Sequence, residues 1–234
     1  MAALTVDSSV AMGRGAVACT QGAEATGRRT MMQFEVDPRR MALLNIDVQN
    51  VFVEIAADAP AVVERINRLA EVCRGAAIPV IHVRHAVPAD ADLGILGEMF
   101  PPVREGMLDR TSHSAAFHES LVMDPSDHVL EKPHFGAFHD TDLLARLELL
   151  GVGTIIITGI ETNVCCETTA REAMVRDVRA FFISDATTTG GVPGLEVAEV
   201  QRASLATVGT FFAQVATTDE MIDWIGAASE SSTR

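Results

Sequence analysis

The sequence predicts an α/β fold in which a six-stranded parallel sheet lies between helices on both faces, giving three layers. From residue 41 onward, strand-like and helix-like segments alternate along the chain. The first of them, MALLNID at 41–47, is an almost continuous apolar run, which is typical of a strand buried on both faces. The 234 residues, 48% of them hydrophobic, suffice for one domain with a large core, whereas two full domains would be cramped.

Each later element follows from its own pattern. The segment 60–76 has Val62, Val63, Ile66 and Leu69 at helical spacing, and Pro79 then opens a second strand. The predicted strands are 41–47, 79–84, 127–132, 153–159, 178–184 and 211–217, and the predicted helices are 60–76, 140–150, 163–176, 195–208 and 218–227. Right-handed crossovers would make all the strands parallel, and ligands then gather at their carboxyl ends.

The region 86–126 lacks regular periodicity. It contains four prolines, Pro88, Pro101, Pro102 and Pro125, and is predicted to be mostly loop with short helices. A loop of this length in a compact domain often covers an active site.

The first 33 residues are rich in Ala, Gly, Ser and Thr and show neither helical nor strand periodicity. They are predicted to be a disordered extension (1–33) preceding a single domain (34–234). A start codon assigned too far upstream would give the same pattern, because Met31, Met32 and Met41 lie just before the first strand. No run approaches the roughly 18 apolar residues of a membrane span, so we expect a soluble protein.

The net charge of the chain restricts its binding partners. Lys and Arg number 18 against 32 Asp and Glu, a net charge of −14, which opposes binding to nucleic acid or to an anionic membrane. A small-molecule partner is favoured.

The four cysteines, at 19, 73, 165 and 166, form no CxxC pair, which indicates a reducing compartment and a cytoplasmic protein.

Cys165 is the first candidate for chemistry. It follows a strand and the turn TGIETNVC and opens a helix, where free backbone N–H groups and the helix dipole would lower the pKa of a thiol. The same N–H groups could hold a developing oxyanion. The alternative is a small buried core residue, the usual fate of a free cysteine, and position alone leaves the two readings even.

Asp47 and Lys132 are polar residues at the ends of predicted strands. Asp47 could take the thiol proton and later deliver it to a leaving nitrogen, or it could simply cap the turn at 48–50. Lys132 could stabilise a thiolate and orient the carboxylate, or it could be a solvated strand-end lysine. Each alternative is competitive when the residue is taken singly.

Three segments occur together in the order and context of a known family: LLNIDVQNVFV at 43–53, EKPHFGAFHDTDL at 131–143 and TGIETNVCCETTAREAMVRDVRAFFISDAT at 158–187. On these segments the chain from about 41 to 225 resembles the isochorismatase-like cysteine hydrolases, which have a Rossmann-like fold. The resemblance implies a catalytic triad of Asp47, Lys132 and Cys165. It also implies a cis peptide at Ile160–Glu161 and an oxyanion hole formed by the N–H groups of Glu161 and Cys165.

The resemblance further implies the reaction. Cys165 would attack an amide or carbamoyl carbon to form a thioester or thiocarbamate, which water then hydrolyses, and no cofactor is needed. Isochorismatases proper do not depend on the cysteine, so its presence argues against that branch. Nicotinamidases carry a metal-binding Asp-x-His with a further His, but 51–81 has no histidine. His82 and His85 would lie on opposite faces of one strand, and we predict no metal.

The predicted enzyme is therefore an amidohydrolase that cleaves a carbon–nitrogen bond in a small amide or ureido (N-carbamoyl) substrate. The K-P-x-F-x-A-F and N-V-C-C-E-T-T-A-R-E-A runs resemble ureidoacrylate, biuret and N-carbamoyl amino acid hydrolases. The alternatives are a nicotinamidase, an isochorismatase-type hydrolase and a catalytically silent binding protein on the same fold. Relatives are commonly oligomers, which implies a homodimer or homotetramer.

Residues flanking the triad segments are candidates for substrate binding, although each could equally be core or strand-end filler. Arg84 would suit a substrate carboxylate. The predicted apolar walls are Phe52, Phe135 and Phe138, and the polar candidates are Gln49, Arg84, His85 and Thr162.

Overall fold

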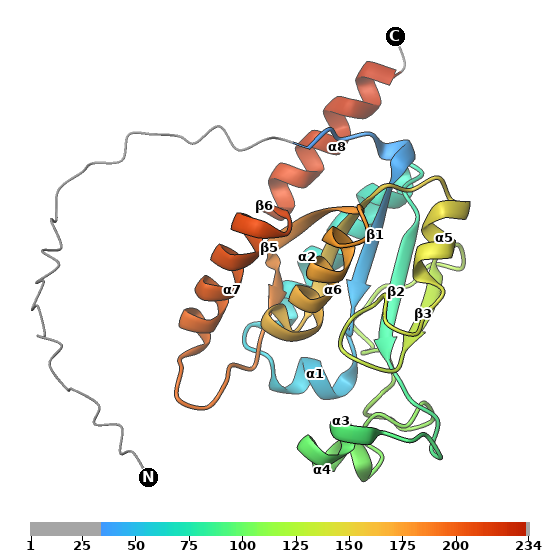
Figure 1. The fold of residues 1–234 in the computed structure, drawn as a ribbon. Coiled ribbons are helices and arrows are strands. Elements are labelled where there is room, and N and C mark those ends of the chain that lie inside the picture. The colour runs from blue at the N-terminus through green and yellow to red at the C-terminus, as the bar shows by residue number, and fades with distance from the viewer. Residues whose placement is uncertain (1–33, 233–234) are drawn as a thin grey trace, which may run out of the picture. The chain divides into compact units, whose positions relative to one another are not determined.

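Six parallel strands form one sheet in the order β3-β2-β1-β4-β5-β6 (Figure 1). The structure is a computed structural model that describes residues 34–232, so the extension predicted at 1–33 lies outside the described residues. The strands are β1 (Met41–Ile46), β2 (Val80–His85), β3 (His128–Lys132), β4 (Thr154–Ile160), β5 (Arg179–Thr188) and β6 (Gln214–Ala216). This arrangement confirms the predicted fold class.

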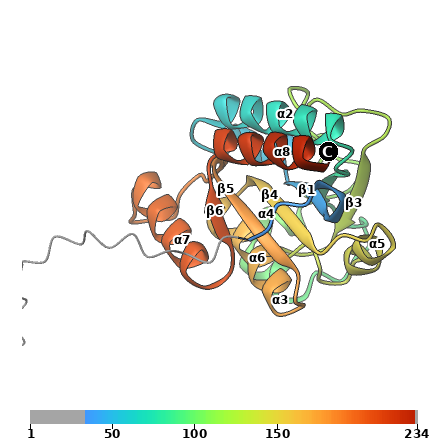
Figure 2. The same cartoon turned by 90° about the horizontal axis from the view of Figure 1, so that it is seen from above.

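Helices cover both faces of the sheet (Figure 2). One face carries α2 (Ala59–Gly75) and α8 (Thr218–Ser232), which contact each other and β5. The opposite face carries α5 (Leu143–Leu149), α6 (Glu167–Met174) and α7 (Val197–Phe211). The remaining short helices are α1 (Asn50–Ile55), α3 (Gly94–Met99) and α4 (Pro101–Arg104), with a 3₁₀ turn at Pro38–Arg40 and a π-helical turn at Thr162–Cys166. None of the described helices is long and apolar enough to cross a membrane.

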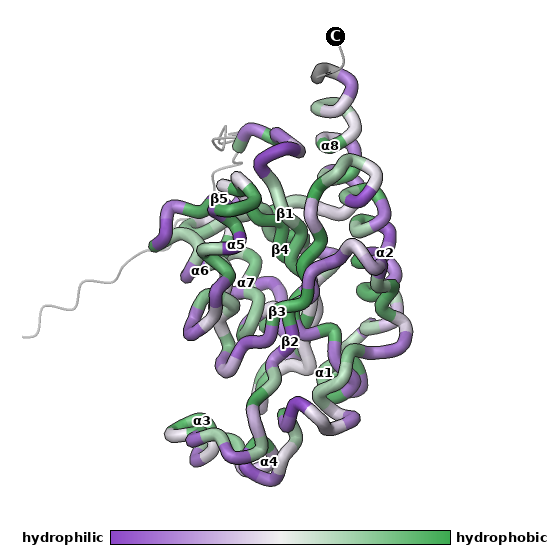
Figure 3. The backbone as a smooth tube through the Cα atoms, turned by 90° about the vertical axis from the view of Figure 1, so that its right-hand side faces the viewer, coloured by the Kyte–Doolittle hydropathy of each residue, from purple (hydrophilic) through white to green (hydrophobic). Residues whose placement is uncertain are grey.

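The central strands have two buried faces, which explains their continuous apolar sequences. In β1, Leu44 and Ile46 pack into the core under α5 and α6, whereas Met41 and Leu43 pack into the core under α2 and α8. Figure 3 shows β1 and β4 as hydrophobic over most of their lengths. The pattern that predicted β1 therefore has a direct physical cause.

The strand order reverses at β1. The chain runs from β1 outward through β2 to β3, and then returns to β4 on the other side of β1. At such a switch point the connections leave the carboxyl ends of two neighbouring strands in opposite directions, which opens a crevice there. Asp47 follows β1 directly and Cys165 follows β4 within one turn, so both lie at this crevice.

Two strand boundaries differ from the sequence prediction by more than one residue. β5 extends to Thr188 because, beyond a register shift in β4, Thr187 and Thr188 pair with Gly159 and Ile160. β6 is shorter than predicted because α7 continues through Phe211. The loop region 86–126 contains α3 and α4, as expected, while the six-residue α1 was not predicted.

A buried ion network fixes the start of β3 against α2. The carboxylate of Asp127 accepts hydrogen bonds from Arg74 Nε at 3.0 Å and contacts His82 Nε2 at 2.9 Å. Hydrogen bonds from Arg74 help to hold the pKa of Asp127 at about 2, against the effect of burial, which raises it. His82 is thereby held against the start of β3, on the face of β2 opposite to His85, and its Nδ1 lies 3.3 Å from Asn45 Nδ2 of β1.

Candidate active site

Asp47 lies at the end of β1 with a left-handed backbone (φ 51°), a conformation that Asp tolerates better than most residues. Its N–H donates to the carbonyl of Val83 at 2.8 Å, which ties it to β2. The residue is fully buried. The chain turns here from β1 toward α1, so the carboxylate is left at the carboxyl edge of the sheet.

Gly159 lets β4 approach β1 closely at this edge. A Cβ at this position would lie 1.9 Å from the carbonyl oxygen of Ile46, and the φ of +123° is itself unsuited to other residues. Only glycine satisfies both conditions. The close approach brings the turn after β4 against the residue that precedes Asp47.

The turn after β4 contains the cis peptide bond Ile160–Glu161, at the position that the resemblance implied. Residues Thr162–Cys166 then form a π-helical turn, in which Cys166 N–H donates to Glu161 O at 3.1 Å. The carbonyl of Cys165 accepts from Thr169 Oγ1 at 2.7 Å, which anchors it to α6. Cys165 therefore lies within a π-helical turn. The sequence predicted instead that it opens an α-helix.

Lys132 is the last residue of β3 and the only lysine in the sequence. Its Nζ lies 2.8 Å from Asp47 Oδ2 and donates to His134 O, also at 2.8 Å. Both side chains of the ion pair are fully buried. The structure thus brings residues from β1 and β3 together across β2, and the solvated alternative for Lys132 is wrong.

The thiol of Cys165 interacts with both members of this pair. Burial raises its pKa well above the usual range, and the nearby Lys132 ammonium only partly offsets this. The predicted lowering by a helix terminus is therefore wrong, because the side chain is 4% exposed and desolvation dominates. Burial therefore favours the protonated thiol at rest.

Burial also raises the pKa of Asp47, although the ammonium of Lys132 and the thiol act to lower it. Burial acts to lower the pKa of Lys132, but Asp47 and Cys165 outweigh it and the net shift is upward. These contacts thus favour a resting state in which Asp47 is a carboxylate, Lys132 is an ammonium and Cys165 is a neutral thiol.

His85 joins this cluster from the end of β2. One ring nitrogen lies within 4.8 Å of both an Asp47 oxygen and the Cys165 sulfur. Burial and the positive charge of Lys132 lower the pKa of His85 to about 3, so the ring is neutral. Its Nε2 donates to Pro133 O at 3.1 Å, which leaves Nδ1 as an acceptor.

Asp47, His85 and Cys165 are also the described residues whose arrangement could hold a metal ion. His85 has no partner at ligand spacing in the sequence, whereas the fold brings Asp47 and Cys165 to it from beyond the ends of β1 and β4. However, the Lys132 ammonium already lies 2.8 Å from the carboxylate and would repel a second cation. The donor set therefore suits proton transfer better than metal binding.

Several predicted pocket residues have other roles. Gln49 Nε2 donates to His85 O and Ala115 O, and its Oε1 accepts from His85 N–H, so this amide positions β2 and the loop. Arg84 lies on the opposite face of β2 from His85 and pairs with Glu131 across β3. The structure therefore places Arg84 on the face away from His85, where Glu131 engages it, and its contact with a substrate carboxylate stays an untested prediction.

The three predicted phenylalanines differ in their packing, although Phe135 also contacts the core cluster that contains Phe138. Phe52 and Phe135 are partly buried and pack against the cluster formed by Val87 and the α3–α4 segment. Phe135 also contacts the His85 ring edge-on at 6.1 Å, so it borders the triad. Phe138 instead packs in the core, with the guanidinium of Arg176 5.3 Å from its ring beyond the end of α6. Cys165 belongs to the same core cluster, so a role for Phe138 as a pocket wall stays a prediction.

Two polar atoms in the turn before Cys165 are buried without a hydrogen-bond partner among the described residues, Thr162 Oγ1 and Asn163 Oδ1. Buried polar atoms are normally paired, so a bound ligand or water is the expected partner. Thr162 was predicted as a binding residue. Asn163 was not, although its place between Thr162 and the cysteine was the available signal.

Fold and site together define a class: a three-layer α/β protein with a buried thiol, carboxylate and ammonium at the carboxyl edge of its sheet. Residues 41–220 match the family model of the isochorismatase domain. The chain belongs to the isochorismatase family and is a hydrolase. The match covers most of the chain and confirms the resemblance.

Individual relatives represent more than one branch of the family. The chain is 39% identical over 150 residues to nicotinamidase 3 of Arabidopsis thaliana, covering 63% of this chain and 73% of the relative. It is 30% identical over 205 residues to the ureidoacrylate amidohydrolase RutB of Methylobacterium radiotolerans, covering 77% of each. A solved cysteine hydrolase from Pseudomonas syringae pv. phaseolicola 1448A superposes with a TM-score of 0.80 at 33% identity, covering 84% of this chain and 97% of that one.

Proposed function

We propose that the protein is a cysteine-dependent amidohydrolase that cleaves a carbon–nitrogen bond in a small amide or ureido (N-carbamoyl) compound. The observation that carries the proposal is the buried contact of Asp47 with Lys132, at 2.8 Å, beside the thiol of Cys165. Burying an ion pair next to a buried thiol costs stability. Such an arrangement is therefore typical of a functional site.

In the first half of the reaction, Asp47 removes the thiol proton as the Cys165 sulfur attacks the substrate carbonyl carbon. The carbonyl oxygen gains negative charge, for which we assign the N–H groups of Glu161 and Cys165 as donors. The carbon–nitrogen bond then breaks, and Asp47 delivers the proton to the leaving nitrogen. Because the resting cysteine is protonated, proton transfer and attack belong to one step.

In the second half, Asp47 removes a proton from water, and the resulting hydroxide attacks the thioester or thiocarbamate. The carbon–sulfur bond breaks, and the proton held by Asp47 returns to the sulfur. Lys132 keeps its proton throughout and compensates the negative charge that moves between Asp47 and Cys165. The neutral ring of His85 offers Nδ1 as an acceptor for the incoming water.

The surroundings support a small planar substrate with both an apolar and a polar edge. Phe52 and Phe135 supply apolar contact, while Thr162 Oγ1 and Asn163 Oδ1 are buried and have no hydrogen-bond partner within residues 34–232. An amide or ureido N–H would satisfy these oxygens. The similarity to a ureidoacrylate amidohydrolase favours a ureido compound.

Nicotinamide is the second candidate substrate, because a nicotinamidase is among the relatives at 39% identity. An ammonia-release screen over ureido acids, biuret, N-carbamoyl amino acids, nicotinamide and primary amides distinguishes the two. We expect a ureido compound to be the best substrate, and activity confined to nicotinamide would refute that choice.

Cys165→Ala tests the mechanism with the same screen, and Cys73→Ala, a buried cysteine of α2, is its matched control. We expect Cys165→Ala to lose activity by at least about 10³-fold and Cys73→Ala to retain it. Quenched samples of the wild type should carry an acyl or carbamoyl mass on Cys165 alone. Near-native turnover by Cys165→Ala would overturn the proposal. We further expect a dimer or tetramer by sedimentation, and a cytoplasmic protein.

A further inference from the structure

Thr169 joins the turn that carries Cys165 to the loop that follows Lys132. It lies on α6, one helical turn after Cys165, and its side chain is fully buried. Its hydroxyl donates to Cys165 O at 2.7 Å and accepts from Ala137 N–H at 3.1 Å. Since an N–H can only donate, these roles are fixed, and the single hydroxyl proton goes to the carbonyl of Cys165. One side chain is thus bonded to the backbone of both segments.

The loop after β3, residues 133–138, also holds the ammonium of Lys132. Lys132 Nζ donates to His134 O at 2.8 Å, so the position of this carbonyl contributes to the position of the ammonium. Three residues further along the loop, Ala137 N–H donates to Thr169. A shift of the loop away from α6 would therefore move an acceptor of Lys132. The ion pair with Asp47, whose charged atoms lie 2.8 Å apart, would then have to adjust.

A second residue of α6 holds the same loop. Glu172 Oε2 accepts a hydrogen bond from Phe138 N–H at 2.9 Å. Gly136 lies so close to this carboxylate that a Cβ there would overlap with it. The absence of a side chain at Gly136 therefore permits the close approach of the loop to the helix. Two successive N–H groups of the loop, those of Ala137 and Phe138, are thus bonded to Thr169 and Glu172.

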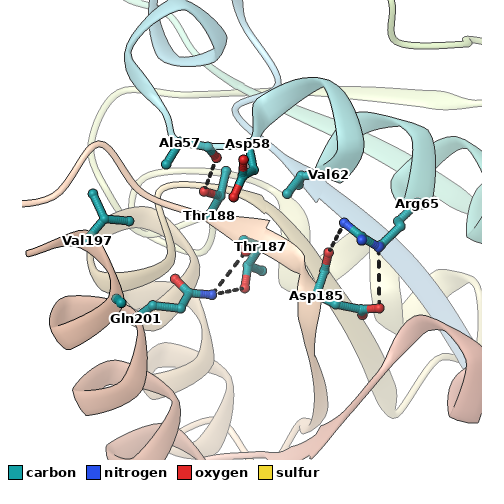
Figure 4. A pocket seen from close by; sticks show the side chains of 10 residues that line it. Ala57, Asp58, Val62, Arg65, Asp185, Thr187, Thr188, Val197 and Gln201 are labelled. Atoms are coloured by element: carbon teal, nitrogen blue, oxygen red, sulfur yellow. Dashed lines mark hydrogen bonds and ion pairs between the residues drawn. The ribbon is translucent and has the colours of Figure 1, made fainter.

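Another buried threonine at the carboxyl edge of the sheet makes a hydrogen bond of the same kind away from the triad. In Figure 4, Thr188 at the end of β5 donates to Ala57 O, at a distance of 2.5 Å. This bond joins the strand to the connection between α1 and α2, and it involves neither Cys165 nor the loop after β3. Thr188 is therefore the matched control for Thr169.

We propose that Thr169 and Glu172 are positioning residues for the triad. They hold the loop after β3 on α6, which keeps the Lys132 ammonium beside the sulfur of Cys165. The inference rests on the proposed roles of Lys132 and Cys165 in the reaction. An ammonium stabilises a thiolate most strongly at short range, because the interaction energy falls with distance. Displacement of the loop would therefore slow the step in which the sulfur attacks the substrate.

Thr169→Val tests the proposal because valine keeps nearly the shape of threonine but lacks the hydroxyl. Since Lys132 is the only lysine, the full-length protein made with isotope-labelled lysine gives one side-chain NMR signal, which reports the surroundings of the ammonium without any turnover. We expect this signal to shift in Thr169→Val and to return toward the wild-type position in Thr169→Ser. It should stay unchanged in Thr188→Val. An unchanged signal in Thr169→Val, or an equal shift in Thr188→Val, would overturn the proposal.

Turnover separates a positioning role from a general loss of stability. Thr169→Val should lose up to about 10²-fold in kcat with KM little changed, as expected for a small misplacement of reacting groups. Thr169→Ser should recover most of this loss. A loss confined to KM, or no recovery with serine, would contradict the positioning role. If the wild type turned over none of the screened compounds, the proposed function would fail, whereas the lysine signal would still decide the present proposal.

Gly136→Ala tests the loop from the side of Glu172 and does not depend on whether Thr169→Val folds. The new Cβ would displace the flexible carboxylate and leave Phe138 N–H without its acceptor. Gly75→Ala, at the end of α2 with open space around it, is the matched control. We expect the lysine signal to shift in Gly136→Ala and not in Gly75→Ala. A signal that is the same in both variants would refute the role of Glu172.

Discussion

Replacing Lys132 by Met tests whether the buried ion pair is a coupled unit. Both Lys132 and Asp47 have fully buried side chains, and their charged atoms lie 2.8 Å apart. Methionine keeps the length of the side chain but leaves the carboxylate without its cation. Removing one partner of a buried pair costs about 3–5 kcal/mol. Asp47→Asn should cost a similar amount because it strands the ammonium.

The double variant Lys132→Met/Asp47→Asn leaves no unpaired charge. Its loss of stability should therefore be smaller than the sum of the two single losses, by about 2–3 kcal/mol. Urea unfolding of all four proteins at pH 7 measures this coupling energy. Additivity of the two single losses within about 0.5 kcal/mol would refute the reasoning. All three variants should lack turnover, including the double variant, which should still fold.

The stability of the Lys132→Met variant should also depend on pH in a predictable direction. The folded-state pKa of Asp47 is raised by burial, and loss of the ammonium raises it further. A carboxyl group with a raised folded pKa favours the folded state at low pH, and this contribution is lost as pH rises through the folded pKa. The stability deficit of Lys132→Met relative to wild type should therefore shrink as pH falls from 7 to 5. A deficit that grows over this range would contradict the assignment.

Three further predictions concern single residues. Gly159→Ala should destabilise by more than about 4 kcal/mol, because the new Cβ meets the carbonyl of Ile46 at 1.9 Å, whereas Gly226→Ala in α8, with open space around it, should be neutral or stabilising in the same urea assay. His85 has a pKa of about 3 in the folded protein against 6.5 when unfolded, so the unfolded state binds a proton more readily as pH falls from 6.5 toward 3. The free energy of unfolding should therefore decrease by about 1.4 kcal/mol per pH unit in this range, and His85→Asn should lack this dependence. Because Lys132 is the only lysine, isotope-labelled lysine gives one side-chain NMR signal, which should remain that of an ammonium at pH 10.5; deprotonation below that pH would contradict the raised pKa.

The sheet was predictable because its strands are buried on both faces and therefore have continuous apolar sequences. β1 and β4 are the clearest cases. The end of β5 was not predictable from composition, since Asp185, Thr187 and Thr188 are polar and are drawn into the sheet by pairing with β4. α1 has only six residues and no side-chain hydrogen bond at its N-cap, so no local pattern marks it.

The site was predictable as a set of strand ends, but its finer features depend on burial and register. The thiol of Cys165 was expected to be acidic from its place in the chain, and burial reverses that expectation. The contact of His85 with the triad depends on which strands are neighbours, and no local pattern in the sequence reveals the strand order. The face of Arg84, by contrast, followed from strand alternation, since Arg84 and His85 are adjacent residues of β2.

Burial of the triad has a consequence for how the proposed reaction is controlled. Since the resting Cys165 is a protonated, almost inaccessible thiol, it is a poor target for oxidants and alkylating agents, which react with thiolates. The sulfur becomes nucleophilic only when its proton moves to Asp47, a transfer that creates a thiolate beside the Lys132 ammonium. The ion pair then changes partners, from carboxylate to thiolate, without any net change in the buried charge. On the proposed mechanism, the sulfur reacts only when a substrate carbonyl carbon is in place to bond with it as the proton leaves. The fixed ammonium of Lys132 then stabilises the negative charge as it moves from Asp47 to the sulfur within this buried site.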